Sequence, residues 1–387
     1  MPRRLLINLL SALAILPLAL TGNPATAQEC VNPFRDAGPL RFEPSWWTLT
    51  DFCKHSVPYS EIFSGGPPPD GIPPIDAPQF ESIAEARKWL QDQSPVIVLE
   101  VGGEARAYPL AILTWHEIVN DVIGGTPVAV TFCPLCNSAI VFDRRVGEQT
   151  LRFGVSGNLR NSDLIMWDNF TESWWQQFTG EGIVGAYTGT KLKVIPSQLT
   201  DFAAFEAAYP KGVVLNRNTG NDRSYGRNPY VGYDTSPRPF LFSGTPDPRL
   251  PAMERVLGGL VGGQAVAYPF GILAQVGVVN DTVGGQPVVA FWQDGAVSAL
   301  DDSRIDESRR VGTAALYGRV VNAQTLTFRR GADGTITDVE TGSTWNVFGR
   351  AISGPLKDTQ LNREVAGPHF WFAWAAFRPE TTVYAAK

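Results

Sequence analysis

The stretch VGGEARAYPLAIL at residues 101–113 recurs as VGGQAVAYPFGIL at residues 261–273. The agreement continues at the same offset of 160 residues, where the second copy repeats the Val-Asn-Asp, Gly-Gly and Pro-Val of residues 119–128. Ungapped identity over this length is difficult to attribute to chance, and a spacing of about 150 residues is the size of a domain rather than of a solenoid repeat. The sequence therefore predicts two related lobes that arose by internal duplication.

Weaker echoes extend this repeat and set the expected boundaries. Thr-Glu-Ser-Trp-Trp at residues 171–175 resembles Thr-Gly-Ser-Thr-Trp at residues 341–345. We expect a first lobe at residues 95–235 and a second, degenerate lobe at residues 250–387. The 38 Gly and 30 Pro residues favour short strands and turns over helices. The predicted fold class is therefore α+β and rich in β-strands, with a few helices.

The N-terminus has the three parts of a secretory signal peptide: a basic pair at residues 3–4, an apolar core at residues 5–20 and Ala-Thr-Ala at residues 25–27. A single membrane anchor is the other interpretation, but Asn8 and Pro17 interrupt the short apolar core. We predict that residues 1–27 are removed, which leaves a periplasmic or secreted chain without a stable membrane anchor. A formal net charge of −6 without basic clusters argues against nucleic acid as a partner. A small-molecule or protein partner is not identified by the sequence.

Residues 28–94 are expected to form an N-terminal strap that contains a Pro/Gly-rich segment at residues 64–76 and then a short helix that begins near Ser82. The Pro/Gly-rich segment is consistent with either a linker or an ordered strap. Two of the four cysteines, Cys30 and Cys53, flank the start of this region. In an oxidising compartment we expect them to form a structural disulfide. His55 lies two residues from Cys53, so a metal role for this pair stays open.

The other two cysteines, Cys133 and Cys136, follow the apolar run at residues 128–132, which is typical of a buried strand. Cys-x-x-Cys spacing lets both sulfur atoms face one point. Such a pair suits a soft metal ion, thiol–disulfide exchange or a plain disulfide. The sequence locates a candidate site but leaves these three chemistries open.

The repeat provides an internal control for this site. Three side chains that could bind a metal are absent from the equivalent positions of the second lobe, whereas the Gly-Gly, Tyr-Pro and Asn-Asp pairs are present in both lobes. The three residues and their replacements are Cys133 with Gln293, Cys136 with Ala296, and His116 with Val276. We interpret Cys133, Cys136 and His116 as one functional unit that the shared architecture does not require.

A metal site is the leading interpretation of this unit. His116 precedes an apolar run that leads through the Gly124-Gly125 turn into the strand before Cys133, so pairing of the two runs would make them neighbours. A His-Cys-Cys set suits zinc or copper. His369 could complete the site from the second lobe. The resulting hypothesis is an exported metal-binding protein, which could also be a metalloenzyme. The alternatives are a thiol–disulfide redox protein and a non-catalytic binding or structural module.

A polar, Gly-rich segment follows the cysteine pair in the first lobe. Its side chains could line a pocket with aromatic walls, although turn and surface roles fit each of them as well. These weaker pocket candidates are Ser156, Asn158, Asp163, Asp168 and Glu172.

Several stretches together resemble the uncharacterised family called domain of unknown function 3179. They are Ser64–Pro73, His116–Asp121, Cys133–Cys136, Gly154–Gly157, Thr171–Gly180 and Phe370–Trp374. The resemblance covers most of the chain after the leader and supports treating the strap and both lobes as one unit. It implies no activity.

Overall fold

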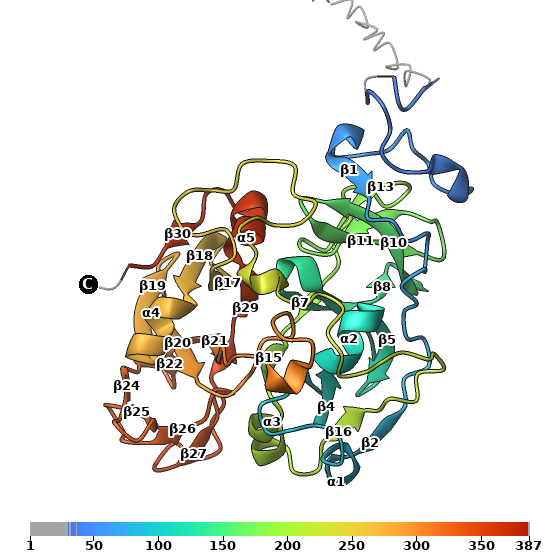
Figure 1. Ribbon diagram of the computed structural model, residues 1–387. Helices are drawn as coiled ribbons and strands as arrows, with labels where there is room; N and C mark the ends of the chain where they lie inside the picture. Colours follow the sequence, from blue (N-terminus) through green and yellow to red (C-terminus); the bar gives the residue numbers. More distant parts are fainter. Residues whose placement is uncertain (1–29, 31, 36, 386–387) are drawn as a thin grey trace, which may run out of the picture.

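The structure is a computed structural model that describes residues 30, 32–35 and 37–385. The predicted signal peptide at residues 1–27 lies outside the described residues. Figure 1 shows two β-rich halves side by side, with the first half drawn in blue to green and the second in orange to red. Strands outnumber helices throughout, which confirms the predicted β-rich fold with few helices.

The first half contains three sheets that surround the cysteine region. The first has the order β15-β3-β4-β16-β2 and the second the order β14-β7-β6-β5, while the third has the order β1-β10-β11-β12-β13. The strands are β1 (Ile62–Ser64), β2 (Phe80–Ser82), β3 (Pro95–Val101), β4 (Glu104–Pro109), β5 (Ile118–Ile123), β6 (Thr126–Cys133), β7 (Ser138–Asp143), β10 (Phe153–Arg160), β11 (Asp163–Asp168), β12 (Trp174–Gln176), β13 (Glu181–Val184), β14 (Val194–Ile195), β15 (Gln198–Asp201) and β16 (Val213–Leu215).

Short helices and a small hairpin connect these strands. Ser82 caps α1 because its hydroxyl accepts the N–H of Glu85 at 3.3 Å, as the Ser-x-x-Glu pattern predicts. The other elements are α1 (Ile83–Ala86), α2 (Leu110–His116), η3 (Pro134–Cys136), α3 (Phe202–Ala208) and the hairpin of β8 (Arg145–Val146) with β9 (Gln149–Thr150).

The second half repeats this order of elements. Its sheets have the orders β29-β17-β18-β30, β19-β20-β21-β28 and β24-β25-β26-β27. The elements are β17 (Arg255–Val261), β18 (Gln264–Pro269), α4 (Phe270–Val276), β19 (Val278–Val283), β20 (Gln286–Gln293), β21 (Thr313–Gly318), β22 (Val320–Val321), β23 (Gln324–Thr325), β24 (Phe328–Arg330), β25 (Ile336–Asp338), β26 (Thr344–Trp345), β27 (Ala351–Ser353), β28 (Asn362–Arg363), β29 (Val365–Phe370), α5 (Trp371–Phe377) and β30 (Thr382–Val383).

Strand register also agrees between the halves. Val96 pairs with Pro109 in the first half, and Val256 pairs with Pro269 in the second. A side-chain bridge recurs too, because Asn120 holds the backbone of Phe153 by two hydrogen bonds and Asn280 holds that of Phe328 in the same way. These amides, of which Asn120 is buried, fix how each hairpin meets the following sheet.

The two halves share one hydrophobic core. A single cluster of buried residues includes Val130 and Phe142 of the first half together with Val256 and Phe370 of the second. Strand β7 of the first half contacts β29 of the second. Their counterparts also contact each other, with β21 of the second half in the place of β7 and β15 of the first half in the place of β29. Each half therefore contributes the same two kinds of strand to the interface.

The Pro/Gly-rich segment forms an ordered strap along the first half. Asp70 binds β10 through two backbone hydrogen bonds, one from its own N–H to Val155 O and one from Val155 N–H to its carboxylate. Ile75 forms a β-bridge to Val119. Proline has no backbone N–H, but its carbonyl oxygen can still accept a hydrogen bond. Pro73 O is hydrogen-bonded to the ring of His116, the last residue of α2.

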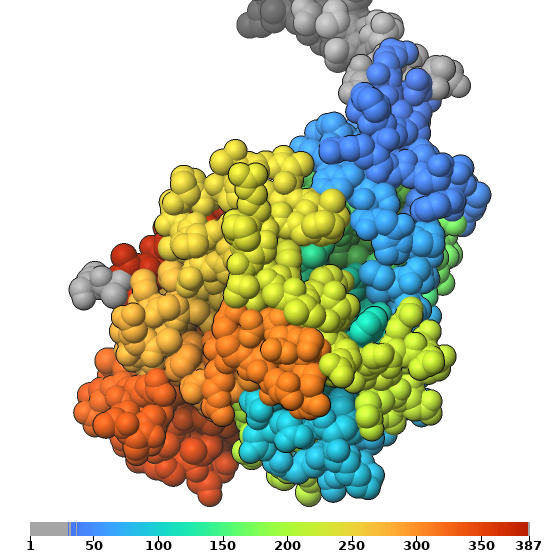
Figure 2. Space-filling view, in the orientation of Figure 1, coloured from blue at the N-terminus to red at the C-terminus, as the bar shows by residue number. Residues whose placement is uncertain are grey.

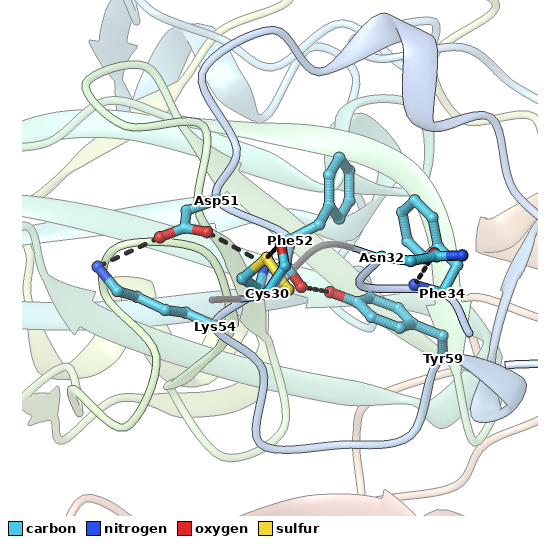
Figure 3. Close-up of a disulfide and its surroundings, with 8 residues drawn as sticks. Cys30, Asn32, Phe34, Asp51, Phe52, Lys54 and Tyr59 are labelled. Carbon is cyan, nitrogen blue, oxygen red and sulfur yellow. Dashed lines mark hydrogen bonds and ion pairs between the residues drawn. A yellow bond between two sulfur atoms is a disulfide. The ribbon is translucent and has the colours of Figure 1, made fainter. Parts of the chain in front are cut away.

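A disulfide joins Cys30 and Cys53, as predicted (Figure 3). The surrounding segment packs Phe42 and Trp47 against Trp174 of β12. Tyr59 donates a hydrogen bond to Phe52 O at 2.6 Å beside the disulfide (Figure 3). Aromatic packing and the disulfide together hold a segment that has little regular secondary structure.

The connection between the halves, residues 216–254, contains one short helix, η4 (Tyr233–Thr235), and no strand. Figure 2 shows this yellow-green to yellow segment draped over the boundary between the halves. A connection of this length without strands is uncommon and usually has a function of its own. No helix in the described part of the chain is long and apolar enough to cross a membrane.

Removing the disulfide tests how far it stabilises the N-terminal segment. The double variant Cys30→Ser/Cys53→Ser should lower the free energy of unfolding of this segment by about 3 kcal/mol, because the open loop regains conformational entropy. Limited proteolysis should therefore cut the variant between residues 30 and 60 faster than the wild type. Reductant should reproduce this susceptibility in the wild type and leave the variant unchanged. Equal resistance of both proteins would mean that aromatic packing alone holds the segment.

Candidate metal centre

The two cysteines lie where β6 ends and β7 begins. Cys133 is the last residue of β6, and Cys136 ends the single turn of η3. Pro134 starts this turn with a suitable φ, and Asn137 reverses the chain at a φ of +48°. Cys133 then pairs with Ser138 across the two strands. This tight connection brings both sulfur atoms to one side.

Asp163 provides a third donor beside the two sulfur atoms. It starts β11 directly after a turn in which Asn161 and Ser162 have positive φ. The ligand atoms of Cys133, Cys136 and Asp163 all lie within 4.8 Å of one another, and all three residues are buried. Ser162 O lies 3.5 Å from the Cys136 sulfur. The hairpin between β10 and β11 thus positions a carboxyl group against the Cys-x-x-Cys pair.

One oxygen of Asp163 is held by the protein and the other is not. Oδ2 accepts hydrogen bonds from Gln176 Nε2 at 2.7 Å and from the Phe178 N–H at 2.9 Å. Oδ1 is buried without a hydrogen-bond partner in the described residues. Burial raises the pKa of Asp163 to about 7. Burial also raises the pKa of both thiols, and that of Cys136 is further raised by Cys133.

Further polar atoms around the cysteines are buried without partners in the described part of the chain. They are Ser138 Oγ, Gln176 Oε1 and Gln177 Oε1. The other ends of both amides are engaged, since Gln176 binds Asp163 and Gln177 Nε2 donates to Thr131 Oγ1 at 2.8 Å. Buried polar atoms normally have partners, so a group of unpaired ones beside two thiols indicates a place for an ion or water.

Glu117 is a buried carboxyl group next to this cluster. It caps the end of α2 at a φ of +57°, where the second half has Gly277 at +72°. Tyr230 donates to its Oε1 at 3.4 Å. Burial, with a smaller contribution from the nearby charge of Asp163, raises the pKa of Glu117 to about 8. A non-glycine residue at positive φ costs free energy, so the retained carboxyl group indicates a role for this side chain.

His116 does not join the cluster of donors. It ends α2 rather than lying in the strand that leads to the Gly124-Gly125 turn, so its ring faces the strap. Nδ1 lies 2.6 Å from Pro73 O, and Nε2 lies 2.7 Å from the Tyr225 hydroxyl. With both nitrogen atoms engaged, the side chain connects the strap, α2 and the connection between the halves.

His369 lies apart from the two sulfur atoms, in β29 of the second half. Its ring stacks on Trp374 and contacts Phe178, with ring centroids 5.3 and 4.7 Å away. Burial lowers the pKa of His369 to about 3, so the ring is neutral. The ring lines a separate cavity between the halves. His55 is exposed and bonds Val57 O, beside the disulfide rather than the cysteine pair.

The remaining pocket candidates have structural partners. Ser156 and Asn158 lie in the bulge of β10, where the Ser156 hydroxyl accepts the Asn158 N–H. Asp168 binds Trp175 Nε1 at 2.9 Å, and Asp338 binds Trp345 Nε1 at the same distance in the second half. Glu172 accepts the Leu49 N–H at 2.8 Å. Asp163 is therefore the member of this group that meets the two sulfur atoms.

The connection between the halves covers the site. Tyr233 donates to Leu135 O at 2.9 Å, between the two cysteines, and Tyr230 reaches Glu117. Ser162 donates to Phe240 O further along the same segment. Two hydroxyl groups and one backbone carbonyl of this connection thus contact Leu135, Glu117 and Ser162 around the cluster. Sequence reasoning did not single out Glu117, although its replacement by Gly277 in the second half was a usable signal.

The free-energy cost of the positive φ at Glu117 can be measured directly. Replacing it with the glycine found in the second half, Glu117→Gly, should raise the free energy of unfolding by about 1 kcal/mol, because positive φ no longer strains the backbone. Urea denaturation of the two proteins measures the difference. Glu172→Gly is the matched control. Glu172 also has a positive φ, but its replacement additionally removes the hydrogen bond from the Leu49 N–H. A less stable Glu117→Gly protein would show that this carboxyl group supports the fold instead.

His369 should make stability depend on pH. Its pKa is lowered from 6.5 to about 3 in the folded chain. The unfolded chain therefore binds a proton that the folded chain excludes, and stability falls as pH drops below about 6.5. The difference between the wild type and His369→Gln should approach about 1.4 kcal/mol per pH unit between pH 6 and 4.5. Parallel stability curves from denaturant titrations would contradict a buried neutral ring.

Comparison with known proteins places the chain in a family without adding an activity. The family model described as "Protein of unknown function (DUF3179)" matches residues 69–381. No curated protein and no solved structure matches the chain. The matched region contains the end of the strap, both halves and every residue of the candidate metal centre. The chain therefore belongs to the DUF3179 family.

Proposed function

We propose that this chain is an exported metal-binding protein whose ion is held by Cys133, Cys136 and Asp163. The observation that carries the proposal is the burial of two thiols beside a carboxylate oxygen without another partner. Asp163 Oδ1 has no partner and the two thiols make only long hydrogen bonds to Ser162 O, at 3.9 and 3.5 Å, so a bound cation would give all three a stronger partner. Glu117 adds a fourth acidic group at the edge of the same cluster.

The donor set favours zinc over copper. Zinc accepts a mixture of thiolate and carboxylate ligands, and three protein ligands with one open position are typical of catalytic zinc sites. Copper sites with two thiolates commonly add imidazole, and both nitrogen atoms of His116 already have partners. We therefore propose zinc as the ion, with one position left for water or substrate.

Glu117 makes a metalloenzyme the more specific form of this proposal. A carboxylate beside metal-bound water can accept its proton, and zinc lowers the pKa of that water to about 7. Glu117 is buried close enough to the cluster for its charge to raise the pKa of Cys133. We propose that the positive charge of the bound ion lowers the raised pKa of Glu117, that the resulting carboxylate accepts this proton, and that Tyr230 orients it.

Export and duplication are proposed on separate observations. The signal-peptide pattern at residues 1–27 and the Cys30–Cys53 disulfide both support a location outside the cytoplasm. The repeated order of elements, with the same register in β3–β4 and β17–β18, supports an internal duplication. In this account the second lobe kept the scaffold and lacks the metal ligands.

Metal analysis tests the leading proposal. Protein purified from the periplasm without chelator should contain about one zinc ion per chain by mass spectrometry of the metal. Cys133→Ser/Cys136→Ser and Asp163→Asn should each reduce this content to near zero, because each removes a ligand. Glu117→Gln should keep the ion, since it leaves all three ligands in place.

Control variants separate this result from misfolding and from redox chemistry. Cys30→Ser/Cys53→Ser removes the same number of cysteines and should retain the ion. Unchanged zinc in Cys133→Ser/Cys136→Ser would contradict the proposal. A metal-free wild type whose Cys133 and Cys136 react rapidly with a disulfide reagent would favour thiol–disulfide exchange. An unreactive, metal-free pair would favour a binding or structural module.

A further inference from the structure

A second site lies at the boundary between the two halves. A cavity of about 100 Å³ is bounded by β7 at residues 139–141, β29 at residues 365–367 and the rings of Phe178 and Trp374. The walls are largely apolar. Two basic side chains, His369 and Arg378, line the cavity. A mostly apolar cavity with a few convergent polar groups is the usual form of a small-molecule site.

His369 contributes a polar ring to the wall of this cavity. The residue is 4% exposed, and its Nδ1 has no hydrogen-bond partner in the described residues. Stacking on Trp374 at an interplanar angle of 21° fixes the plane of the ring. Because Nδ1 has almost no accessible surface, a ligand in the cavity would hydrogen-bond the other ring nitrogen, Nε2, which has no hydrogen-bond partner among the described residues.

Arg378 brings a positive charge to the same cavity. It caps the C-terminal end of α5, and its Nη1 donates to Phe377 O at 2.8 Å. Arg378 forms no salt bridge among the described residues, and the carboxylates of Glu181 and Glu380 lie close enough only to raise its pKa against the larger lowering effect of burial. Arginine stays protonated in proteins and binds carboxylates through two parallel hydrogen bonds. A partly buried, unpaired arginine therefore favours an anionic ligand.

The equivalent interface between the halves also has a cavity, of about 470 Å³, whose lining includes Glu100, Pro196 and Arg363 but no counterpart of the His369–Arg378 pair. There β21 contacts β15, and Thr200 occupies the position of His369 while Tyr209 occupies that of Arg378. Tyr209 packs its ring against Phe348 at 5.3 Å and donates to Glu100 at 2.8 Å. The same architecture thus places Thr200 and Tyr209 at one interface and His369 and Arg378 at the other.

We propose that the cavity between β7 and β29 binds a small organic carboxylate with a flat apolar body. Arg378 would pair with the carboxylate, and His369 would hydrogen-bond the same end of the ligand. Phe178 and Trp374 would pack against the apolar body. The volume of about 100 Å³ limits this body to a single ring or a short chain.

Phe178 connects this cavity to the metal centre. Its ring lines the cavity, while its backbone N–H donates to Asp163 Oδ2 at 2.9 Å. The carboxylate site nevertheless stands on His369 and Arg378 and does not require a bound metal. Its test can therefore succeed or fail independently of the zinc measurement.

Benzoate is a suitable probe, with benzamide as its uncharged analogue. Isothermal titration of the full mature chain should give saturable, 1:1 binding of benzoate and at least tenfold weaker binding of benzamide. Arg378→Gln should weaken benzoate at least tenfold and leave benzamide unchanged, because it removes the charge that pairs with the carboxylate. Arg310→Gln is the matched control, since it removes an equal charge from an exposed residue of the same half.

A second variant distinguishes a loss of benzoate binding from a loss of folding. His369→Leu removes an unsatisfied buried nitrogen, so it should fold at least as stably as the wild type and bind benzoate several-fold more weakly. Circular dichroism and thermal denaturation establish folding for each variant. The inference is overturned if benzoate shows no saturable binding at concentrations up to about 10 mM. It is also overturned if Arg310→Gln weakens benzoate binding as much as Arg378→Gln does.

Discussion

The packing of β7 on β29, with β21 on β15, is the contact on which the rest of the structure depends. One hydrophobic cluster runs through both halves, beside two clusters that lie within the second half alone. The contact also fixes both candidate sites. Strand β7 starts just after Cys136 and forms a wall of the cavity that contains His369.

Burial decides the chemistry that each site can perform. Thiols used for exchange need exposure and a lowered pKa, whereas Cys133 and Cys136 are buried and have raised pKa values. Burial therefore favours a ligand role in the first half. In the second half it keeps His369 neutral beside the cationic Arg378, which gives that cavity one charge and one neutral polar group.

Local patterns in the sequence were sufficient for much of the fold. The Gly124-Gly125 turn gave the hairpin of β5 and β6, and Ser82 gave the start of α1, because the few residues involved determine such features. The helix at Leu110–His116 was not predicted, since its apolar residues are buried on nearly all sides and show no helical period. That missed helix also explains why His116 was expected beside Cys133.

The sequence by itself determined the β-rich class, the Cys30–Cys53 bridge, the family and the position of the Cys-x-x-Cys pair, because composition or short spacing specifies each of them. Only the tertiary structure decided that Asp163 and Glu117, rather than His116 and His369, lie next to that pair. The reason is that strand register and the direction of a turn choose which side chain faces a given point. Those choices depend on how β11, α2 and the connection between the halves pack together.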